Sequence, residues 1–223
     1  MAKLRYKYGT MGSSKSTELL ITKKKYEQQG RKVLLFKPED KRNEGVVYSR
    51  ATREEVSCIV VNKDAYLFMF DKVEEEQPEC VLVDECQFLT PQQVVELARI
   101  VDELNVPVIA YGLLTDFQGH LFPASQRFIE LGSVTGEIEN ICYECGKRAT
   151  HNLRYLGVEP VFEGEQIAIE NLDATKELNT GKSTFSTTKK TNTDSEGTTY
   201  AYRAVCRHCY NEAKKVSSLK KLS

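Results

Sequence analysis

Three features that would assign a chain to a common class of protein are missing from this sequence. Its 31 basic and 32 acidic residues leave a net charge of −1, so neither sign is in enough excess to favour binding to nucleic acid or a membrane surface. No apolar run approaches the length that spans a bilayer. The opening residues, Met-Ala-Lys-Leu-Arg-Tyr, lack the apolar centre of a signal peptide. We therefore expect a cytoplasmic protein whose partners include neither a membrane nor nucleic acid.

Cysteine is present in an odd number, seven, which without an export signal favours metal ligands and free thiols over disulfides. Four of these residues form two C-x2-C pairs separated by 60 residues: Cys142 with Cys145, and Cys206 with Cys209. Two such pairs complete a tetrahedral zinc site with no open position. We predict structural zinc, with four reduced thiols as the alternative. The other three lie in or beside predicted strands and are interpreted as core residues: Cys58, Cys80 and Cys86.

A stretch of small residues near the N-terminus has the composition of a phosphate-binding loop. It follows an alternating run at 4–8, precedes a helical pattern, and reads Gly9-Thr10-Met11-Gly12-Ser13-Ser14-Lys15-Ser16-Thr17. In this context backbone N–H groups and a helix N-terminus surround a phosphate. Lys15 would then reach the outer phosphates and the Ser16 hydroxyl would bind Mg²⁺. Ser14 stands where the pattern has glycine, so an ordinary turn is the alternative.

Apolar runs and helical patterns alternate along the first part of the chain. Strands are predicted at 4–8, 32–36, 58–61, 80–83 and 106–111, and helices from residue 17, over 65–76, and from Pro91, with Thr90 as its cap. This alternation indicates a parallel sheet with helices on its faces. Ligands bind at the carboxyl ends of such strands, where the phosphate loop, Asp84-Glu85 and Gly112-Leu113 all stand.

The acidic pair after the fourth predicted strand suits phosphoryl transfer. Asp84 would hold Mg²⁺, and Glu85 would take a proton from an attacking hydroxyl. Because neighbours on an extended strand point to opposite faces, we expect one toward the metal and one toward the acceptor. Asp40 and Arg42 would add metal-water contact and phosphate neutralisation. A solvated acid at the end of a strand is the alternative for Asp84, and a solvated charged turn is the alternative for Asp40 and Arg42.

Two further segments complete the pattern. Four apolar side chains near the predicted ligand edge either sandwich a planar base or belong to the core: Phe88, Leu113, Phe117 and Phe122. Residues 171–197 are rich in Thr, Ser, Asn, Lys and Gly. They are predicted to be mobile, or ordered only by a ligand, because they cannot bury a core. Within them, 181–184 imitate the end of a phosphate loop, but no strand precedes them.

Four groups of residues together resemble the type II thymidine kinases, the cytosolic and bacterial family with a zinc lobe. They are Val83-Asp84-Glu85-Cys86-Gln87-Phe88, Tyr111-Gly112-Leu113-Leu114-Thr115-Asp116-Phe117, Gly119 with Leu121-Phe122-Pro123, and Val205-Cys206-Arg207-His208-Cys209-Tyr210. Their order and spacing cover roughly residues 3–213. The resemblance implies an α/β fold with a RecA-like P-loop core, a parallel sheet with helices on both faces. We expect this core at 1–138, a small zinc-binding domain with a flexible lasso loop at 139–215, and a tail at 216–223.

The same resemblance implies the activity and the residues that perform it. The reaction would be ATP-dependent phosphorylation of the 5′-hydroxyl of thymidine, and of deoxyuridine, in pyrimidine salvage. A homotetramer and feedback inhibition by thymidine triphosphate are also implied. Glu85 matches the general base; Asp84, Ser16, Asp40 and Arg42 match positions associated with Mg²⁺. Positions matching the thymidine pocket are Met11, Phe88, Leu113, Phe117, Phe122, Asn152, Gln166, Ile167, Ala168, Ile169 and Tyr202.

This sequence departs from the family pattern in three places. Ser14 replaces a glycine, a Gly-Gly pair is absent at Glu170-Asn171, and the lasso is lengthened. A zinc-ribbon nucleic-acid binder with an ATPase core is one alternative, favoured by lysine pairs at 189–190, 214–215 and 220–221 but opposed by the balanced charge. A regulatory module without turnover is another, and the retention of both Asp84 and Glu85 argues against it.

Overall fold

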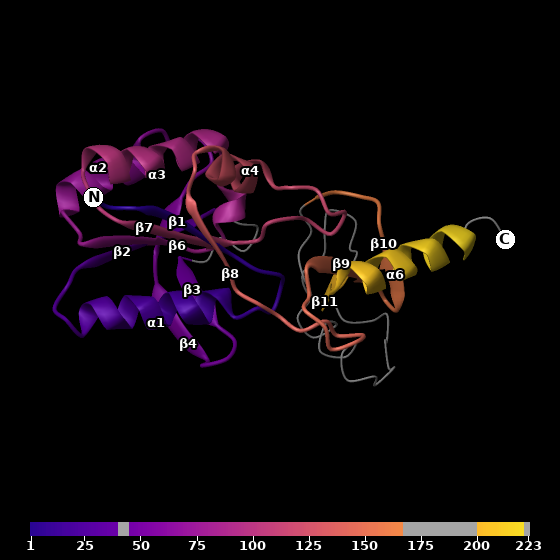
Figure 1. The fold of residues 1–223 in the computed structure, drawn as a ribbon. Coiled ribbons are helices and arrows are strands. Elements are labelled where there is room, and N and C mark those ends of the chain that lie inside the picture. Colours follow the sequence, from indigo (N-terminus) through magenta and orange to yellow (C-terminus); the bar gives the residue numbers. More distant parts are fainter. Residues whose placement is uncertain (40–44, 167–199, 221–223) are drawn as a thin grey trace. The chain divides into compact units, whose positions relative to one another are not determined.

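The computed structural model describes residues 1–39, 45–166 and 200–220, and the chain divides into two compact units (Figure 1). Unit 1 consists of Met1–Gly9, Ser13–Leu114 and Leu121–Ile138. Unit 2 consists of Thr10–Gly12, Thr115–His120 and Glu139–Ser223.

A six-stranded parallel sheet forms the centre of unit 1, in the order β5-β2-β6-β7-β1-β8. Its strands are β1 (Leu4–Tyr8), β2 (Val33–Pro38), β5 (Ile59–Val61), β6 (Cys80–Val83), β7 (Val108–Gly112) and β8 (Val134–Glu137). Every residue of β6 and β7 is buried, which is why these strands are continuous apolar runs. The predicted parallel α/β core is confirmed.

Helices cover both faces of this sheet (Figure 1). On one side lies α1 (Lys15–Glu27); on the other lie α2 (Phe68–Glu76), α3 (Pro91–Glu103) and α4 (Pro123–Glu130). Side chains of one strand alternate between the two layers, so that Leu82 packs in the cluster of Leu19 and Val83 in that of Leu97. No helix in the described ranges has both the length and the apolar character needed to cross a membrane.

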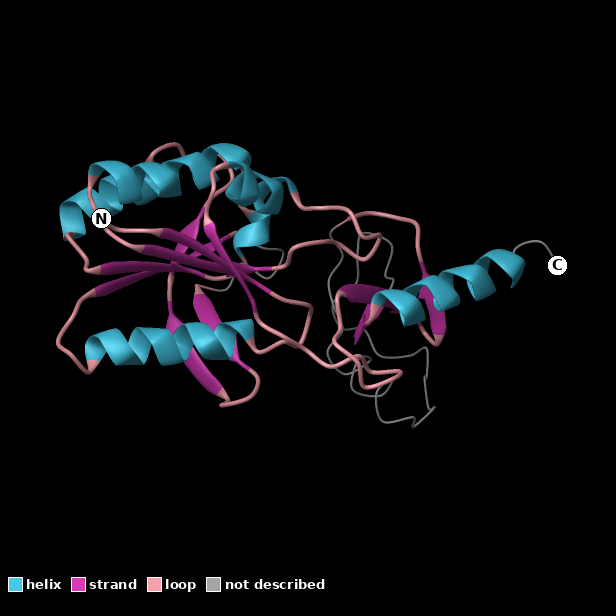
Figure 2. Ribbon diagram, in the orientation of Figure 1, coloured by secondary structure: helices cyan, strands magenta, loops and turns pink. Residues whose placement is uncertain are grey.

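A two-stranded antiparallel hairpin adds to unit 1 on the side of α1 (Figure 2). It consists of β3 (Val46–Ser49) and β4 (Glu54–Ser57). The fully buried Ser49 brings its hydroxyl to within 2.8 Å of the Thr17 hydroxyl on α1. The sequence did not predict this hairpin, because each strand has only four residues and β4 is largely polar.

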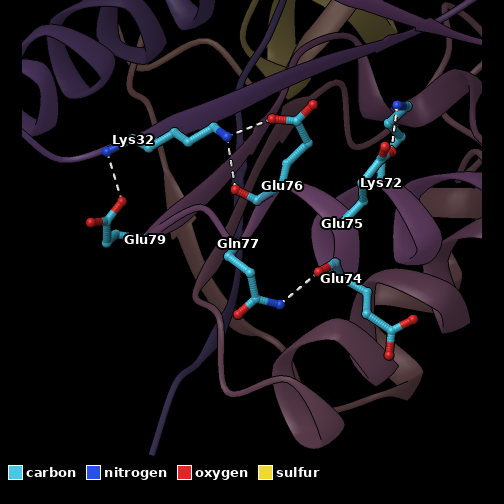
Figure 3. Close-up of polar contacts among 7 residues, drawn as sticks. All are labelled: Lys32, Lys72, Glu74, Glu75, Glu76, Gln77 and Glu79. Carbon is cyan, nitrogen blue, oxygen red and sulfur yellow. Dashed lines mark hydrogen bonds and ion pairs between the residues drawn. The ribbon is translucent and has the colours of Figure 1, made fainter.

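Charged side chains link the end of α2 to the start of β2 (Figure 3). The Lys32 backbone N–H donates to Glu79 Oε2 at 2.7 Å, and Lys32 Nζ donates to the Glu76 carbonyl oxygen at 2.8 Å. Lys72 pairs with Glu75 at 2.7 Å on the same helix. These exposed pairs are screened by water and contribute little to stability. Unit 1 is therefore stabilised mainly by its two apolar layers.

Unit 2 is built on a three-stranded antiparallel sheet in the order β10-β9-β11. Its elements are β9 (His151–Leu156), β10 (Glu159–Val161), β11 (Tyr200–Val205) and the final helix α6 (Arg207–Lys220), which extends through most of the expected tail. Eight buried residues form its core: Cys142, Ala149, Leu153, Tyr155, Ala201, Val205, Cys206 and Tyr210. Two of these eight are predicted metal ligands, so the apolar core alone is small.

Candidate functional site

The predicted phosphate loop joins the end of β1 to the start of α1, as the sequence indicated. A Cβ on Gly9 would lie 2.4 Å from Ser13 Oγ and 2.6 Å from the Ile138 carbonyl oxygen, so only glycine fits there. The Gly9 N–H donates to the Gly112 carbonyl oxygen at the end of β7 (3.2 Å). Lys15 is buried with its Nζ 3.4 Å from the Gly9 carbonyl oxygen, and burial lowers its pKa.

Ser14 has a left-handed backbone, with φ 65° and ψ 29°. A side chain in this region crowds the neighbouring carbonyl and costs about 1–2 kcal/mol. Glycine would adopt this left-handed conformation without strain, which explains its place in the family pattern. Serine adopts it here at an energetic cost.

We predict that Ser14→Gly holds the affinity for MgATP or tightens it by up to about tenfold, because glycine adopts this conformation without strain. Calorimetric titration measures the change. Ser14→Ala is the matched control, since it removes the hydroxyl but retains the strain. A large loss of affinity in both variants would mean that the hydroxyl itself contacts phosphate.

A carboxylate and a hydroxyl lie together behind the loop. Ser16 Oγ donates to Asp84 Oδ2 at 2.8 Å. Asp84 is buried, and its other oxygen, Oδ1, has no hydrogen-bond partner among the described residues. Burial, and then the negative charge of Glu85, raise the pKa of Asp84 to about 7. An orphaned carboxylate oxygen beside a serine hydroxyl is a donor set that Mg²⁺ accepts.

Glu85 differs from its expected conformation. Strand β6 ends at Val83, and Glu85 has a left-handed φ of 49° before the 3₁₀ turn η1 (Cys86–Phe88). The expectation that Asp84 and Glu85 alternate along an extended strand is therefore wrong, because the chain turns between them. A strained backbone of this kind is typical of functional positions.

A buried amide holds the Glu85 carboxylate in this turn. Gln87 Nε2 donates to Glu85 Oε2 at 2.7 Å, and Gln87 Oε1 accepts from the Leu113 N–H at 3.0 Å. A Cβ on Gly112 would lie 2.6 Å from Gln87 Oε1, so glycine is needed for this approach. Sequence reasoning gave Gln87 no role, although it lies within the quoted motif.

Two of the predicted base-contacting residues of unit 1 contact each other, and the third is held by hydrogen bonds. Phe88 and Phe122 meet edge to face, with ring centroids 6.0 Å apart. The Leu113 carbonyl oxygen accepts from Tyr6 Oη and Ser125 Oγ, each at 2.7 Å. Leu113 is thus fixed through both its backbone groups.

In unit 2, the predicted base-contacting residues Asn152 and Met11 are joined by hydrogen bonds. Asn152 is buried; its Oδ1 accepts from the Met11 N–H at 2.8 Å and its Nδ2 donates to the Thr115 carbonyl oxygen at 3.3 Å. Asn140, which sequence reasoning missed, donates to the Met11 carbonyl oxygen at 3.1 Å. Asn152 and Asn140 therefore fix the loop at Met11 from both sides.

The remaining predicted residues divide between described and undescribed parts of the chain. Phe117 and Tyr202 are buried in unit 2. Gln166 donates from its Nε2 to Asp116 Oδ2 at 3.0 Å. Several positions lie outside the described residues: Asp40, Arg42, Ile167, Ala168, Ile169 and the lasso at 171–197.

The four predicted zinc ligands come together in unit 2. The Sγ atoms of Cys142, Cys145, Cys206 and Cys209 all lie within 4.8 Å of one another. The Cys209 N–H, 3.5 Å from Cys206 Sγ, lowers the pKa of the Cys206 thiol to about 6 and so favours the thiolate. Four thiolates at this spacing suit tetrahedral zinc, so these residues fit the metal.

Tyr210, the residue after the last predicted zinc ligand, connects the cysteine cluster to Phe117, a predicted contact of the base. Tyr210 is buried, and its Oη donates to the Phe117 carbonyl oxygen at 2.8 Å. Its ring lies 4.8 Å from that of His151. The backbone at Phe117 is therefore tied to the start of α6, which the cysteine cluster fixes.

Comparison with known proteins points to one family. A family model described as thymidine kinase matches residues 2–210. A thymidine kinase of Streptococcus pyogenes serotype M3 is 46% identical over 172 residues, 76% of this chain and 90% of that protein. One from Streptococcus agalactiae serotype Ia is 45% identical over the same shares. Among solved structures, the Legionella pneumophila ATPase DotB is 15% identical to this chain. The match covers 66% of this chain and 43% of the DotB chain, with a TM-score of 0.39.

Proposed function

This chain belongs to the thymidine kinase family and is an ATP-dependent kinase of thymidine, and we propose that it transfers the γ-phosphate to the 5′-hydroxyl in pyrimidine salvage. The observation that supports this chemistry best is the group in unit 1 formed by Lys15, Ser16, Asp84 and Glu85. It supplies a phosphate-binding cation, a metal-binding oxygen pair and a carboxylate for the acceptor proton.

We propose that the loop at 9–17 binds the triphosphate, with Lys15 and Ser16 supplied by unit 1. Backbone N–H groups of the loop and the N-terminus of α1 face the phosphates, and Lys15 neutralises their charge. Ser16 Oγ and Asp84 Oδ1 are the atoms that would hold Mg²⁺. When bound, Mg²⁺ offsets the charge that develops on the β- and γ-phosphate oxygens. Asp40 and Arg42 remain predicted contributors to this charge balance.

Glu85 is the proposed general base. Gln87 occupies Glu85 Oε2, which leaves Oε1 to accept the proton of the 5′-hydroxyl as that oxygen attacks phosphorus.

We propose that residues of unit 2 bind the thymine base. Met11, Phe117 and Tyr202 are the proposed apolar and aromatic contacts, and hydrogen bonds fix the backbone of the first two. The backbone groups of 166–169 are the proposed partners of the base edge. Phe88, Leu113 and Phe122 in unit 1 remain predicted contacts, as does Asn152, although its polar atoms already bind backbone.

The remaining features of the proposal concern zinc, assembly and regulation. Zinc on the four cysteines has a structural role, because the site has no spare ligand position. Free thiolates require a reducing compartment, which suits the cytoplasm. A homotetramer, deoxyuridine as a second acceptor and feedback inhibition by thymidine triphosphate follow from the resemblance.

The proposed substrate is tested by ADP release from ATP and Mg²⁺ across a panel of nucleosides. Thymidine should give the fastest release, deoxyuridine a slower one, and purine nucleosides none above background. Release stimulated only by single-stranded DNA, with a steep salt dependence, would instead indicate a nucleic-acid-dependent ATPase.

The raised pKa of Asp84 predicts a pH dependence of metal binding. Only the carboxylate binds Mg²⁺, so the apparent affinity for MgADP should fall below about pH 7, approaching tenfold per pH unit. Titrations between about pH 5 and pH 9 measure it. Asp84→Asn is the control, because it responds only to the titration of ADP itself. Equal pH dependences in the two proteins would contradict the role of Asp84.

A further inference from the structure

Arg154 on β9 is a buried cation for which neither the sequence nor the proposed mechanism supplies a role. It is 1% exposed, and within the described ranges its hydrogen bonds go to a hydroxyl and two carbonyl oxygens rather than to a carboxylate. Burying a charge without a carboxylate is unfavourable unless hydrogen bonds and polarizable groups compensate. An apolar side chain of the same size would fill the space without that cost. The charge therefore calls for an explanation other than packing.

The guanidinium group binds three separate segments of unit 2. Its Nε donates to Tyr202 Oη at 2.8 Å, which reaches β11. Its Nη1 donates to the Glu165 carbonyl oxygen at 2.9 Å and its Nη2 to that of Gln166 at 3.3 Å. Its central carbon lies 3.5 Å from the centroid of the Phe117 ring, which belongs to the turn at 115–120. A planar fork with several donors makes all these contacts at once, and no other side chain has this geometry.

These contacts fix the groups that the proposed function assigns to the nucleoside. Phe117 is held twice, its ring by Arg154 and its carbonyl oxygen by Tyr210. Gln166 is also held twice, its carbonyl oxygen by Arg154 and its side chain by Asp116. Tyr202 receives a charge-assisted hydrogen bond from the same guanidinium.

We propose that Arg154 is a positioning residue for nucleoside binding: it sets Phe117, Tyr202 and the backbone at Glu165–Gln166 in one fixed arrangement. This inference rests on the proposed function, because that function makes Phe117 and Tyr202 contacts of the base. Arg154 itself acts through these groups. Its loss should therefore weaken thymidine binding while leaving ATP binding unchanged, because its contacts among the described residues include no residue of the phosphate loop.

The test compares Arg154→Met and Arg154→Lys with the wild type. Methionine keeps the length and removes the charge, whereas lysine keeps the charge and removes the planar fork. In both variants KM for thymidine should rise by about tenfold or more, because displaced binding groups lose affinity steeply. KM for ATP should stay within about twofold. If charge alone mattered, lysine would restore KM for thymidine, and that result would overturn the proposal.

Arg203→Met is the matched control in the same sheet. Arg203 lies over the Tyr143 ring at 4.1 Å and pairs with Glu144 at 2.9 Å, so it too combines an aromatic contact with polar ones. KM for thymidine should stay at the wild-type value in this variant. An equal rise in Arg203→Met and Arg154→Met would indicate general loosening of unit 2 and would contradict a specific role for Arg154.

A further variant, Tyr202→Phe, keeps the proposal testable if Arg154→Met folds poorly. Tyr202→Phe removes only the hydroxyl that accepts from Arg154, and should raise KM for thymidine by about threefold. A wild-type KM in both Tyr202→Phe and Arg154→Lys would overturn the inference. The wild-type protein distinguishes failure of the proposed function from failure of the role of Arg154. If the wild type does not phosphorylate thymidine, the proposed function is wrong. If the wild type does so and KM for thymidine is unchanged in the variants, only the role of Arg154 is wrong.

Discussion

Glu85→Gln is expected to bind ATP and thymidine with near-native affinity and to lower kcat by about a hundredfold or more. The amide has nearly the same shape as the carboxylate but cannot accept the 5′-hydroxyl proton. Its oxygen can still accept the hydrogen bond from Gln87, so the turn at η1 should keep its conformation. Steady-state kinetics measure kcat, and calorimetric titration measures the two affinities.

Glu96→Gln is the control for removing a carboxylate from unit 1. Glu96 is buried in α3 and accepts from the Phe70 N–H at 2.8 Å, near the start of α2. This substitution should alter the thermal stability but leave kcat near the wild-type value. Near-native turnover in Glu85→Gln would remove Glu85 from the role of base.

Cys206→Ser is expected to lose zinc, to lower stability and to raise KM for thymidine by about tenfold or more. Unit 2 has a small core that includes two of the ligands, so metal binding should supply much of its folding free energy. The cluster also fixes the start of α6, from which Tyr210 holds the backbone of Phe117. The loop residues Lys15 and Ser16 belong to unit 1, so ATP affinity should change little.

Cys58→Ser provides the matched control, because Cys58 is a half-buried thiol of unit 1 that lies outside the cluster. It should retain zinc and both affinities. Nucleoside affinity, ATP affinity and zinc content are measured on soluble protein of each variant. Equal losses of both affinities in Cys206→Ser, or a zinc-free wild type with full thymidine affinity, would contradict the proposed link between the metal and the nucleoside.

The parts of the fold that follow from local sequence were predictable. Strands β6 and β7 are continuous apolar runs because both their faces are buried, and Thr90 caps α3 with its hydroxyl 3.2 Å from the Gln93 N–H. The clustering of the four cysteines was predictable from the two C-x2-C pairs, because this spacing is typical of zinc ligands.

The parts that depend on contacts distant in sequence were not predictable. The left-handed Glu85 is held by Gln87, whose second bond reaches Leu113, 26 residues away. Arg154 reaches Tyr202 across 48 residues. A lone glutamine or arginine carries no periodicity or spacing that would reveal such a partner. The hairpin β3–β4 was missed for a related reason, since strands of four residues carry little pattern of their own and these contact the distant helix α1.

Transfer of a labelled γ-phosphate tests most directly that this chain is a thymidine 5′-kinase. The wild-type protein is incubated with γ-labelled ATP, Mg²⁺ and either thymidine or 5′-deoxythymidine, which lacks the acceptor hydroxyl, and the products are separated. The account predicts label in thymidine 5′-monophosphate with thymidine and no labelled nucleotide product with 5′-deoxythymidine. Label that remains in ATP, or that appears only as inorganic phosphate at equal rates with both nucleosides, would contradict it.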